Sequence, residues 1–209
     1  MKKSMQRRFF TFGLVPLLTA MVVIAPSAGW AQSSPSDIVT AFHESLLGVM
    51  KKAKTLGVKG RFEKLASPLK QNFHFRLMIQ VAAGSYWRKA YPAQTDRLVD
   101  SFTRLSISTY ASRFDGYSGQ SFETEGEKPG PQKTILVKTR IIDPGSDPVD
   151  LTYVTRKIKG EWRIIDVLLD VGISELAVRR SEYRRVLKIG GIEGLIETLN
   201  RKADQLLNP

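Results

Sequence analysis

The segment 160–191 leaves the chain little freedom in how it folds, because a short apolar strand runs directly into a basic amphipathic helix. With 3.6 residues per turn, one side of that helix collects the apolar residues Ile173, Leu176, Tyr183 and Leu187. Arg180 projects from the middle of this side, so the sequence predicts that its charge meets a buried carboxylate, a carbonyl or an anionic ligand. The alternative is a salt-bridged arginine at the border of a packed helix.

The strand before that helix carries apolar residues on both faces, since Ile164, Val167 and Leu169 alternate with the equally apolar Ile165 and Leu168. A sheet with one solvated face would instead show strict alternation. One interpretation is a central strand covered by helices on both sides. The other is that one face packs on helices while the second lines an apolar cavity, a common location for small-molecule sites.

The N-terminus has the three-part layout of a secretory signal. Two lysines and two arginines precede an apolar run over 9–24, and a small-x-small site follows at 29–31. We therefore predict a signal peptide over 1–31 with cleavage after Ala31. The alternative, a retained membrane anchor, is disfavoured because the apolar run is shorter than the roughly 20 residues that span a bilayer.

Charge and cysteine content narrow the choice of partners. Removing residues 1–31 from the 209 leaves 178 residues, enough for one domain, with 28 basic against 20 acidic residues and a net charge of +8. Such charge favours anionic surfaces. Because export makes lipid headgroups more available than nucleic acid, we expect an anionic membrane surface and no nucleic-acid partner. The chain has no cysteine, which excludes disulfides and thiol chemistry.

The order of elements predicts an α+β fold. Helical periodicity and a capping serine at 34 predict a helical part over about 35–115. Period-two segments separated by short turns predict an antiparallel meander over about 121–170. Helical spacing then returns over 173–208, so the single domain over 32–209 should end in two helices.

Few residues suggest chemistry. His43 and His74 are distant in sequence, so we expect no metal site and no cofactor. Asp166 and Asp170 share one face of a strand at a spacing of about 13 Å, too wide for a cooperating acid and base. We interpret them as structural carboxylates, predict no catalytic residues, and do not expect an enzyme.

Several short motifs, in order and spacing, resemble the MlaC family of periplasmic lipid-binding proteins, also known as the toluene-tolerance family. The residues that carry the resemblance are Phe73-His74-Phe75, Met78, Gly84, Trp87, Gln94, Phe102, Leu105, Tyr110, Tyr117, Gly119, Gly160-x-Trp162-Arg163-Ile164-x-Asp166-Val167, Ser174, Arg180, Tyr183, Gly191-Ile192 and Leu195. The chain departs from the family at His74, where an acid is usual, and at Asp170-Val171-Gly172. The sequence of residues 173–183 resembles the hopanoid-associated branch of the family, HpnM, more than the phospholipid-shuttling branch.

The resemblance implies an NTF2-like curved antiparallel sheet packed with a helical lobe, and an apolar pocket between them. It also implies a periplasmic shuttle that carries phospholipid or hopanoid between an inner-membrane transporter and an outer-membrane acceptor. Each buried methylene is worth about 0.8 kcal/mol, so acyl chains can be held without catalytic groups.

On this basis we predict a set of lipid-binding residues, with Arg180 as the polar contact or gate. The set comprises Met78, Val81, Phe102, Leu105, Tyr110, Val137, Tyr153, Trp162, Val167, Leu176, Arg180 and Tyr183. Two alternatives stay open: an interaction adaptor of a transporter with a filled interior, or a small enzyme on an NTF2-like scaffold.

Overall fold

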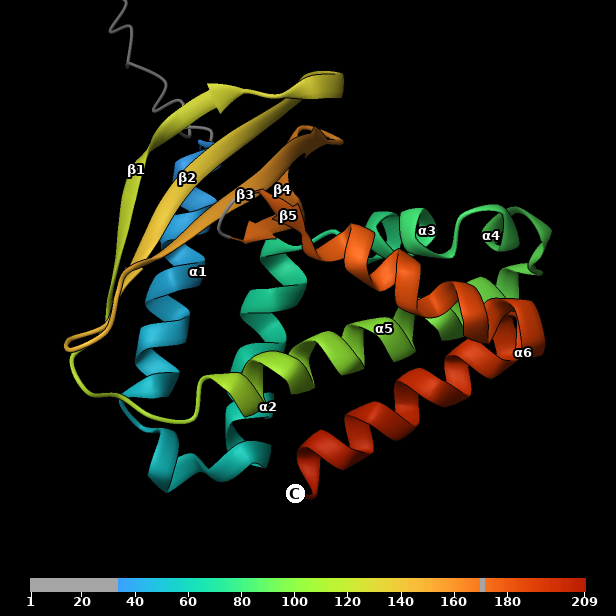
Figure 1. Cartoon of the computed structure of the whole chain (residues 1–209), viewed down its shortest axis with the longest axis horizontal. Helices are drawn as coiled ribbons and strands as arrows, with labels where there is room; N and C mark the ends of the chain where they lie inside the picture. Colours follow the sequence, from blue (N-terminus) through green and yellow to red (C-terminus); the bar gives the residue numbers. More distant parts are fainter. Residues whose placement is uncertain (1–33, 170–171) are drawn as a thin grey trace, which may run out of the picture. The chain divides into compact units, whose positions relative to one another are not determined.

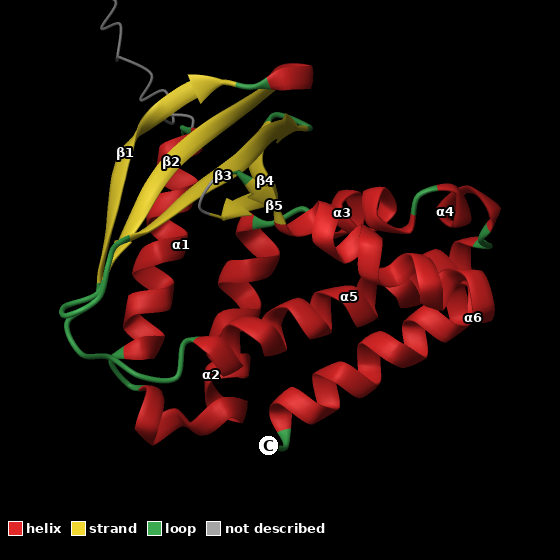
Figure 2. Cartoon of the chain, viewed as in Figure 1, coloured by secondary structure: helices red, strands yellow, loops and turns green. Residues whose placement is uncertain are grey.

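The computed structural model describes residues 34–169 and 172–209, so the predicted signal peptide lies outside the described residues and stays a prediction. Helices come first, a sheet follows, and one long helix ends the chain (Figures 1 and 2). The helices are α1 (Pro35–Met50), α2 (Ala53–Asn72), α3 (Phe75–Ala83), α4 (Ser85–Lys89), α5 (Pro92–Arg113) and α6 (Glu175–Leu207). The strands are β1 (Ser121–Pro129), β2 (Thr134–Ile142), β3 (Val149–Ile158), β4 (Glu161–Leu169) and β5 (Ile173–Ser174), with a 3₁₀ turn η1 (Pro131–Lys133) before β2.

Helix α1 begins at a reciprocal cap. The backbone N–H of Asp37 donates to the Ser34 hydroxyl at 3.1 Å, and the Ser34 N–H donates back to the Asp37 carboxylate at 2.7 Å. Burial at helical spacing then fixes which side of α1 faces the sheet, because Val39, Phe42 and Leu46 are almost fully buried. Helix α1 consequently packs across the strands, and three other aromatic rings lie edge-on to the Phe42 ring.

The five strands form one antiparallel sheet in sequence order, β1-β2-β3-β4-β5. Short turns between consecutive strands produce this meander. A curved antiparallel sheet packed with helices confirms the predicted α+β, NTF2-like fold class.

A β-bulge explains why β4 is apolar on both faces. Pairing with β3 passes from Val154 opposite Asp166 to Thr155 opposite Ile164, which leaves Ile165 as an extra residue. The bulge shifts the alternation, so Ile164 and Val167 are both buried although they are three residues apart. The apolar pattern of β4 therefore reflects a change of register within the strand.

Helix α6 consists of two arms that meet at Gly191, whose positive φ of 59° interrupts the helix. The sequence predicts two closing helices here, and the arms correspond to them. The second arm returns alongside α5 (Figure 1), where Arg104 donates to Asp204 at 2.6 Å and Asn200 donates to the Ser101 hydroxyl at 3.0 Å. Across the described residues, no helix is both long and apolar enough to cross a bilayer.

Candidate functional site

A cavity of about 220 Å³ lies between the sheet and the helices α3, α5 and the first turns of α6. Its walls are predominantly apolar, and charged side chains come only from α5 and α6. The lining residues are Phe73, Phe75, Met78, Phe102, Ser106, Thr109, Tyr110, Arg113, Phe114, Ile141, Val149, Leu151, Tyr153, Val167, Leu169, Glu175, Leu176 and Arg179. Such a space suits an apolar chain that keeps a polar end at the rim.

The motif Phe73-His74-Phe75 joins the helical part to the sheet at this cavity. The His74 N–H donates to the carbonyl of Ile164 in β4 at 2.9 Å, and the His74 Nδ1 accepts from the N–H of Leu77 at 3.1 Å. That second bond caps α3, so a neutral imidazole performs the capping task here. Partial burial lowers the pKa of His74 and favours this neutral form. The flanking phenylalanine rings stack 5.6 Å apart on the cavity wall.

One face of α5 forms a second wall. Phe102, Ser106, Thr109, Tyr110 and Arg113 recur at helical spacing along it and all line the cavity. The Ser106 and Thr109 hydroxyls donate to carbonyls one turn earlier in the helix, each at 2.8 Å. Because these hydroxyls are already paired, they line an apolar space without needing a polar ligand.

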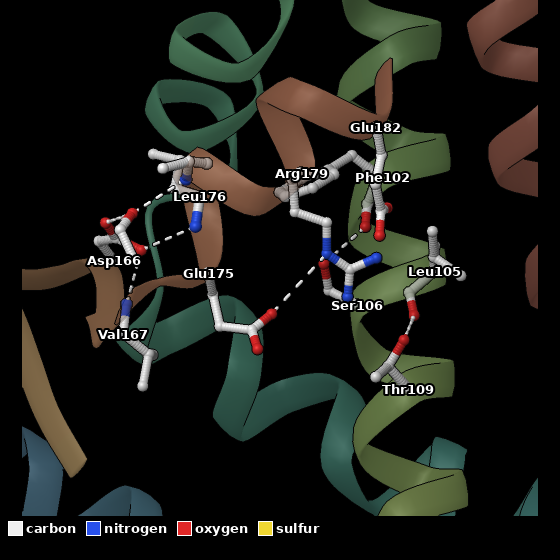
Figure 3. A network of polar contacts seen from close by, with 12 residues as sticks. Phe102, Leu105, Ser106, Thr109, Asp166, Val167, Glu175, Leu176, Arg179 and Glu182 are labelled. Atoms are coloured by element: carbon white, nitrogen blue, oxygen red, sulfur yellow. Dashed lines mark hydrogen bonds and ion pairs between the residues drawn. The ribbon is translucent and has the colours of Figure 1, made fainter. Parts of the chain in front are cut away.

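Asp166 of β4 sets the position of α6 beside the cavity (Figure 3). Its carboxylate accepts the N–H of Val167 at 2.8 Å, the N–H of Leu176 at 3.1 Å and the Ser174 hydroxyl at 2.5 Å. The Ser174 oxygen in turn accepts the N–H of Ala177 at 2.9 Å, which completes the N-terminal cap. Asp166 therefore has the structural role that the sequence analysis assigned to it.

Three charged side chains lie at the rim of the cavity. Glu175 and Arg179 face each other across one turn of α6 (Figure 3), with 4.0 Å between the Arg179 Nε and the Glu175 Oε2. Arg113 reaches the same cavity from the last turn of α5 and is exposed. The rim thus offers two guanidinium groups and one carboxylate above an apolar interior.

Tyr153 ends the cavity on the side of the sheet and shares a 2.9 Å hydrogen bond with Nε2 of His43 in α1. The His43 ring also stacks on Phe122 at 4.1 Å. Burial lowers the pKa of His43 to about 4, so the imidazole is neutral at physiological pH. Among the described residues, no three His, Cys, Asp or Glu side chains gather into a possible metal site.

Half of the predicted lipid-binding residues line the cavity: Met78, Phe102, Tyr110, Tyr153, Val167 and Leu176. Three others are buried in the core away from it: Leu105, Val137 and Tyr183. Val81 is exposed, and the Lys157 ammonium lies over the ring of Trp162 at the start of β4. Whether any of these residues contacts a lipid stays a prediction.

Arg180 shares one side of α6 with Leu176, Tyr183 and Leu187, as predicted, but it does not line the cavity. The side chain is exposed, and its guanidinium lies beside Gly84 at the junction of α3 and α4. The helix turns Glu175, Leu176 and Arg179 toward the cavity instead. Tyr183 and Leu187 are buried, as the predicted phase of the helix requires, so the cavity meets the neighbouring side of α6, where Arg179 lies.

The remaining lining residues are not in the predicted lipid-binding set, although Leu169 belongs to the strand predicted to line a cavity. Phe73 and Phe75 were noted only for the family resemblance, although their alternation around His74 marks two side chains on one side of an extended link. Leu151, Ile141 and Leu169 follow from strand alternation once the register of the sheet is known. Ser106 and Thr109 carry no signal of their own in the sequence.

The fold and the cavity define an α+β protein of NTF2-like architecture with an apolar interior and a charged rim. The profile of the MlaC protein family matches residues 40–201, most of the chain, and the chain belongs to this family.

Individual relatives agree with the family assignment. The intermembrane phospholipid transport system binding protein MlaC of Haemophilus influenzae is 29% identical over 126 residues, and that match spans 58% of each chain. The toluene tolerance protein ttg2D of Pseudomonas putida is 22% identical over 185 residues, 86% of this chain and 83% of its own. A phospholipid-binding protein from Ralstonia solanacearum, solved in complex with a phospholipid, shares the fold with a TM-score of 0.73 and 22% identity, over 83% of this chain and 99% of its own.

Proposed function

We propose that this protein binds a phospholipid in the periplasm and carries it between membranes, without catalysing a reaction. The observation that carries the proposal is the apolar cavity between sheet and helices with charged residues only at its rim. Acyl chains would occupy the interior and the headgroup would stay outside. The names of the Haemophilus and Ralstonia relatives, which refer to phospholipid transport and phospholipid binding, support the same ligand class.

The size of the cavity bears on how much lipid it holds. Its 220 Å³ is below the roughly 300 Å³ at which pockets for drug-sized ligands begin, so this form accommodates part of one acyl chain. Ten buried methylenes would contribute about 8 kcal/mol of transfer free energy, enough for stable binding without further groups. We infer that the sheet and the helices separate further when a complete lipid enters.

The proposed partners are an inner-membrane transporter, an outer-membrane acceptor and the anionic membrane surface between them. An exposed basic face on the first arm of α6 supports this part of the proposal. Arg184, Arg185 and Lys188 are exposed there, and none of them forms an ion pair with another described residue. Clustered cations of this kind attract anionic headgroups by about 1 kcal/mol each.

The test is to isolate the protein from a bacterial periplasm, extract it with organic solvent and identify the bound lipids by mass spectrometry. Phospholipid near one molecule per chain is the expected result. Hopanoid in its place would assign the hopanoid-associated branch. A protein that carries no lipid and takes none up from vesicles would refute the proposal and favour an adaptor role.

A further inference from the structure

The charged residues at the cavity rim include both signs. Glu175 and Arg179 form the least exposed ion pair among the described residues, with side chains 27% and 21% exposed. Their separation of 4.0 Å is long for a charge-assisted hydrogen bond, which is normally about 2.7–2.9 Å. By comparison, Arg140 is held at 2.7 Å by Asp150 and at 3.1 Å by Glu125. Both rim groups therefore keep unused hydrogen-bonding capacity.

Arg113 belongs to the same cluster although it comes from another helix. All three charges affect the pKa of the Tyr110 hydroxyl. Burial raises this pKa most and the Glu175 charge raises it further, whereas the Arg113 and Arg179 charges lower it. All three groups and Tyr110 line the same cavity. A cluster of two cations and one anion leaves an excess of positive charge beside a single negative group.

Tyr183 is a buried neighbour of Arg179. Burial raises the pKa of its hydroxyl to about 12, and Arg179 acts against this shift through its charge and a side-chain hydrogen bond. Because a guanidinium carries five N–H donors, Arg179 keeps donors for a ligand beside Glu175 and Tyr183.

We propose that Glu175, Arg179 and Arg113 form a headgroup site that prefers a zwitterionic aminophospholipid over an anionic one, an inference that rests on the proposed function. The two guanidinium groups bind the phosphate, for which arginine is well suited. The Glu175 carboxylate binds the primary ammonium. A headgroup with a phosphate and no amine satisfies the arginines but leaves Glu175 without a cation of its own.

The experiment offers the lipid-free protein vesicles made of equal parts phosphatidylethanolamine and phosphatidylglycerol, and measures each bound lipid by mass spectrometry. We expect wild type to take up phosphatidylethanolamine about tenfold over its competitor, the effect of one charge-assisted contact. Glu175→Gln should bring this ratio close to one while total uptake persists. Arg179→Gln should lower the uptake of both lipids.

Arg201→Gln is the matched control, because Arg201 forms the same kind of i,i+4 ion pair, with Glu197, but is exposed and outside the cavity. It should leave both the ratio and the total uptake at the wild-type values. Lipid uptake by wild type with no preference, or a preference that Glu175→Gln does not change, would overturn the headgroup site and leave the carrier function intact. Absence of any uptake by wild type would instead overturn the carrier function itself.

Discussion

His43 is a buried imidazole whose protonation the fold opposes. Burial lowers its pKa from 6.5 to about 4 in the folded protein, so the unfolded chain takes up the proton first as the pH falls. The stability that neutral His43 contributes is complete above about pH 6.5 and is lost as the pH drops toward 4. The shift corresponds to about 3 kcal/mol.

Replacing His43 with glutamine should remove this dependence, because the glutamine amide does not titrate. Wild type should lose about 3 kcal/mol more unfolding free energy than His43→Gln between pH 7 and pH 4, measured by denaturant titration at each pH. Other carboxylates and His74 titrate in both proteins, so the difference between them isolates His43. Parallel stability profiles for the two proteins would show that His43 is not responsible.

Asp166 illustrates how one side chain positions an element. Its carboxylate accepts three hydrogen bonds near the start of α6. Removing the carboxylate leaves the two backbone N–H groups and the Ser174 hydroxyl without this acceptor. Asp166→Ala should lower the unfolding free energy by about 2 kcal/mol, as measured by denaturant titration. The control is Asp204→Ala, which removes an exposed ion pair with Arg104 and should cost less than about 1 kcal/mol. Equal losses would contradict the capping role.

The break in α6 depends on a left-handed backbone at Gly191, whereas the preceding Gly190 is helical and has open space around its α-carbon. Gly191→Ala should destabilise the protein by about 1 kcal/mol, because alanine is strained at positive φ. Gly190→Ala should stabilise it by up to about 1 kcal/mol through better helix propensity. Thermal unfolding should show a lower melting temperature for Gly191→Ala and a higher one for Gly190→Ala. Melting temperatures that shift in the same direction in both variants would refute this explanation.

How far the sequence predicts the elements depends on how local their signals are. The strands β2 and β3 lie within the predicted meander, and they begin and end next to the Gly, Pro and Asp residues that mark the turns. The bulge at Ile165 has no local signal, and it changes which β4 residues face inward. The sequence also does not show that the cavity meets Arg179 and not Arg180. The position of α6 beside the cavity is fixed by Asp166, a contact between segments that the sequence alone does not place together.

At the scale of the whole molecule, the cavity exists because the sheet meets helices that do not fill its inner face completely. Filling that space should block lipid without disturbing the fold. Ser106 lies on the cavity wall and is half-buried, so Ser106→Trp should reduce lipid uptake from vesicles at least tenfold. Ser67→Trp places the same side chain on the exposed surface of α2, away from the cavity, and should bind lipid like wild type. Unchanged uptake by Ser106→Trp would indicate that lipid binds elsewhere.

The most direct test of the carrier account is to map where an acyl chain lies in the protein. A phospholipid with a photoactivatable diazirine near the end of one chain would be loaded from vesicles and irradiated, and the cross-linked peptides identified by mass spectrometry. The account predicts cross-links to cavity-lining residues of α3, β3 and β4, such as Met78, Leu151 and Val167. Cross-links confined to the exposed face of α6, with none in the cavity, would contradict it.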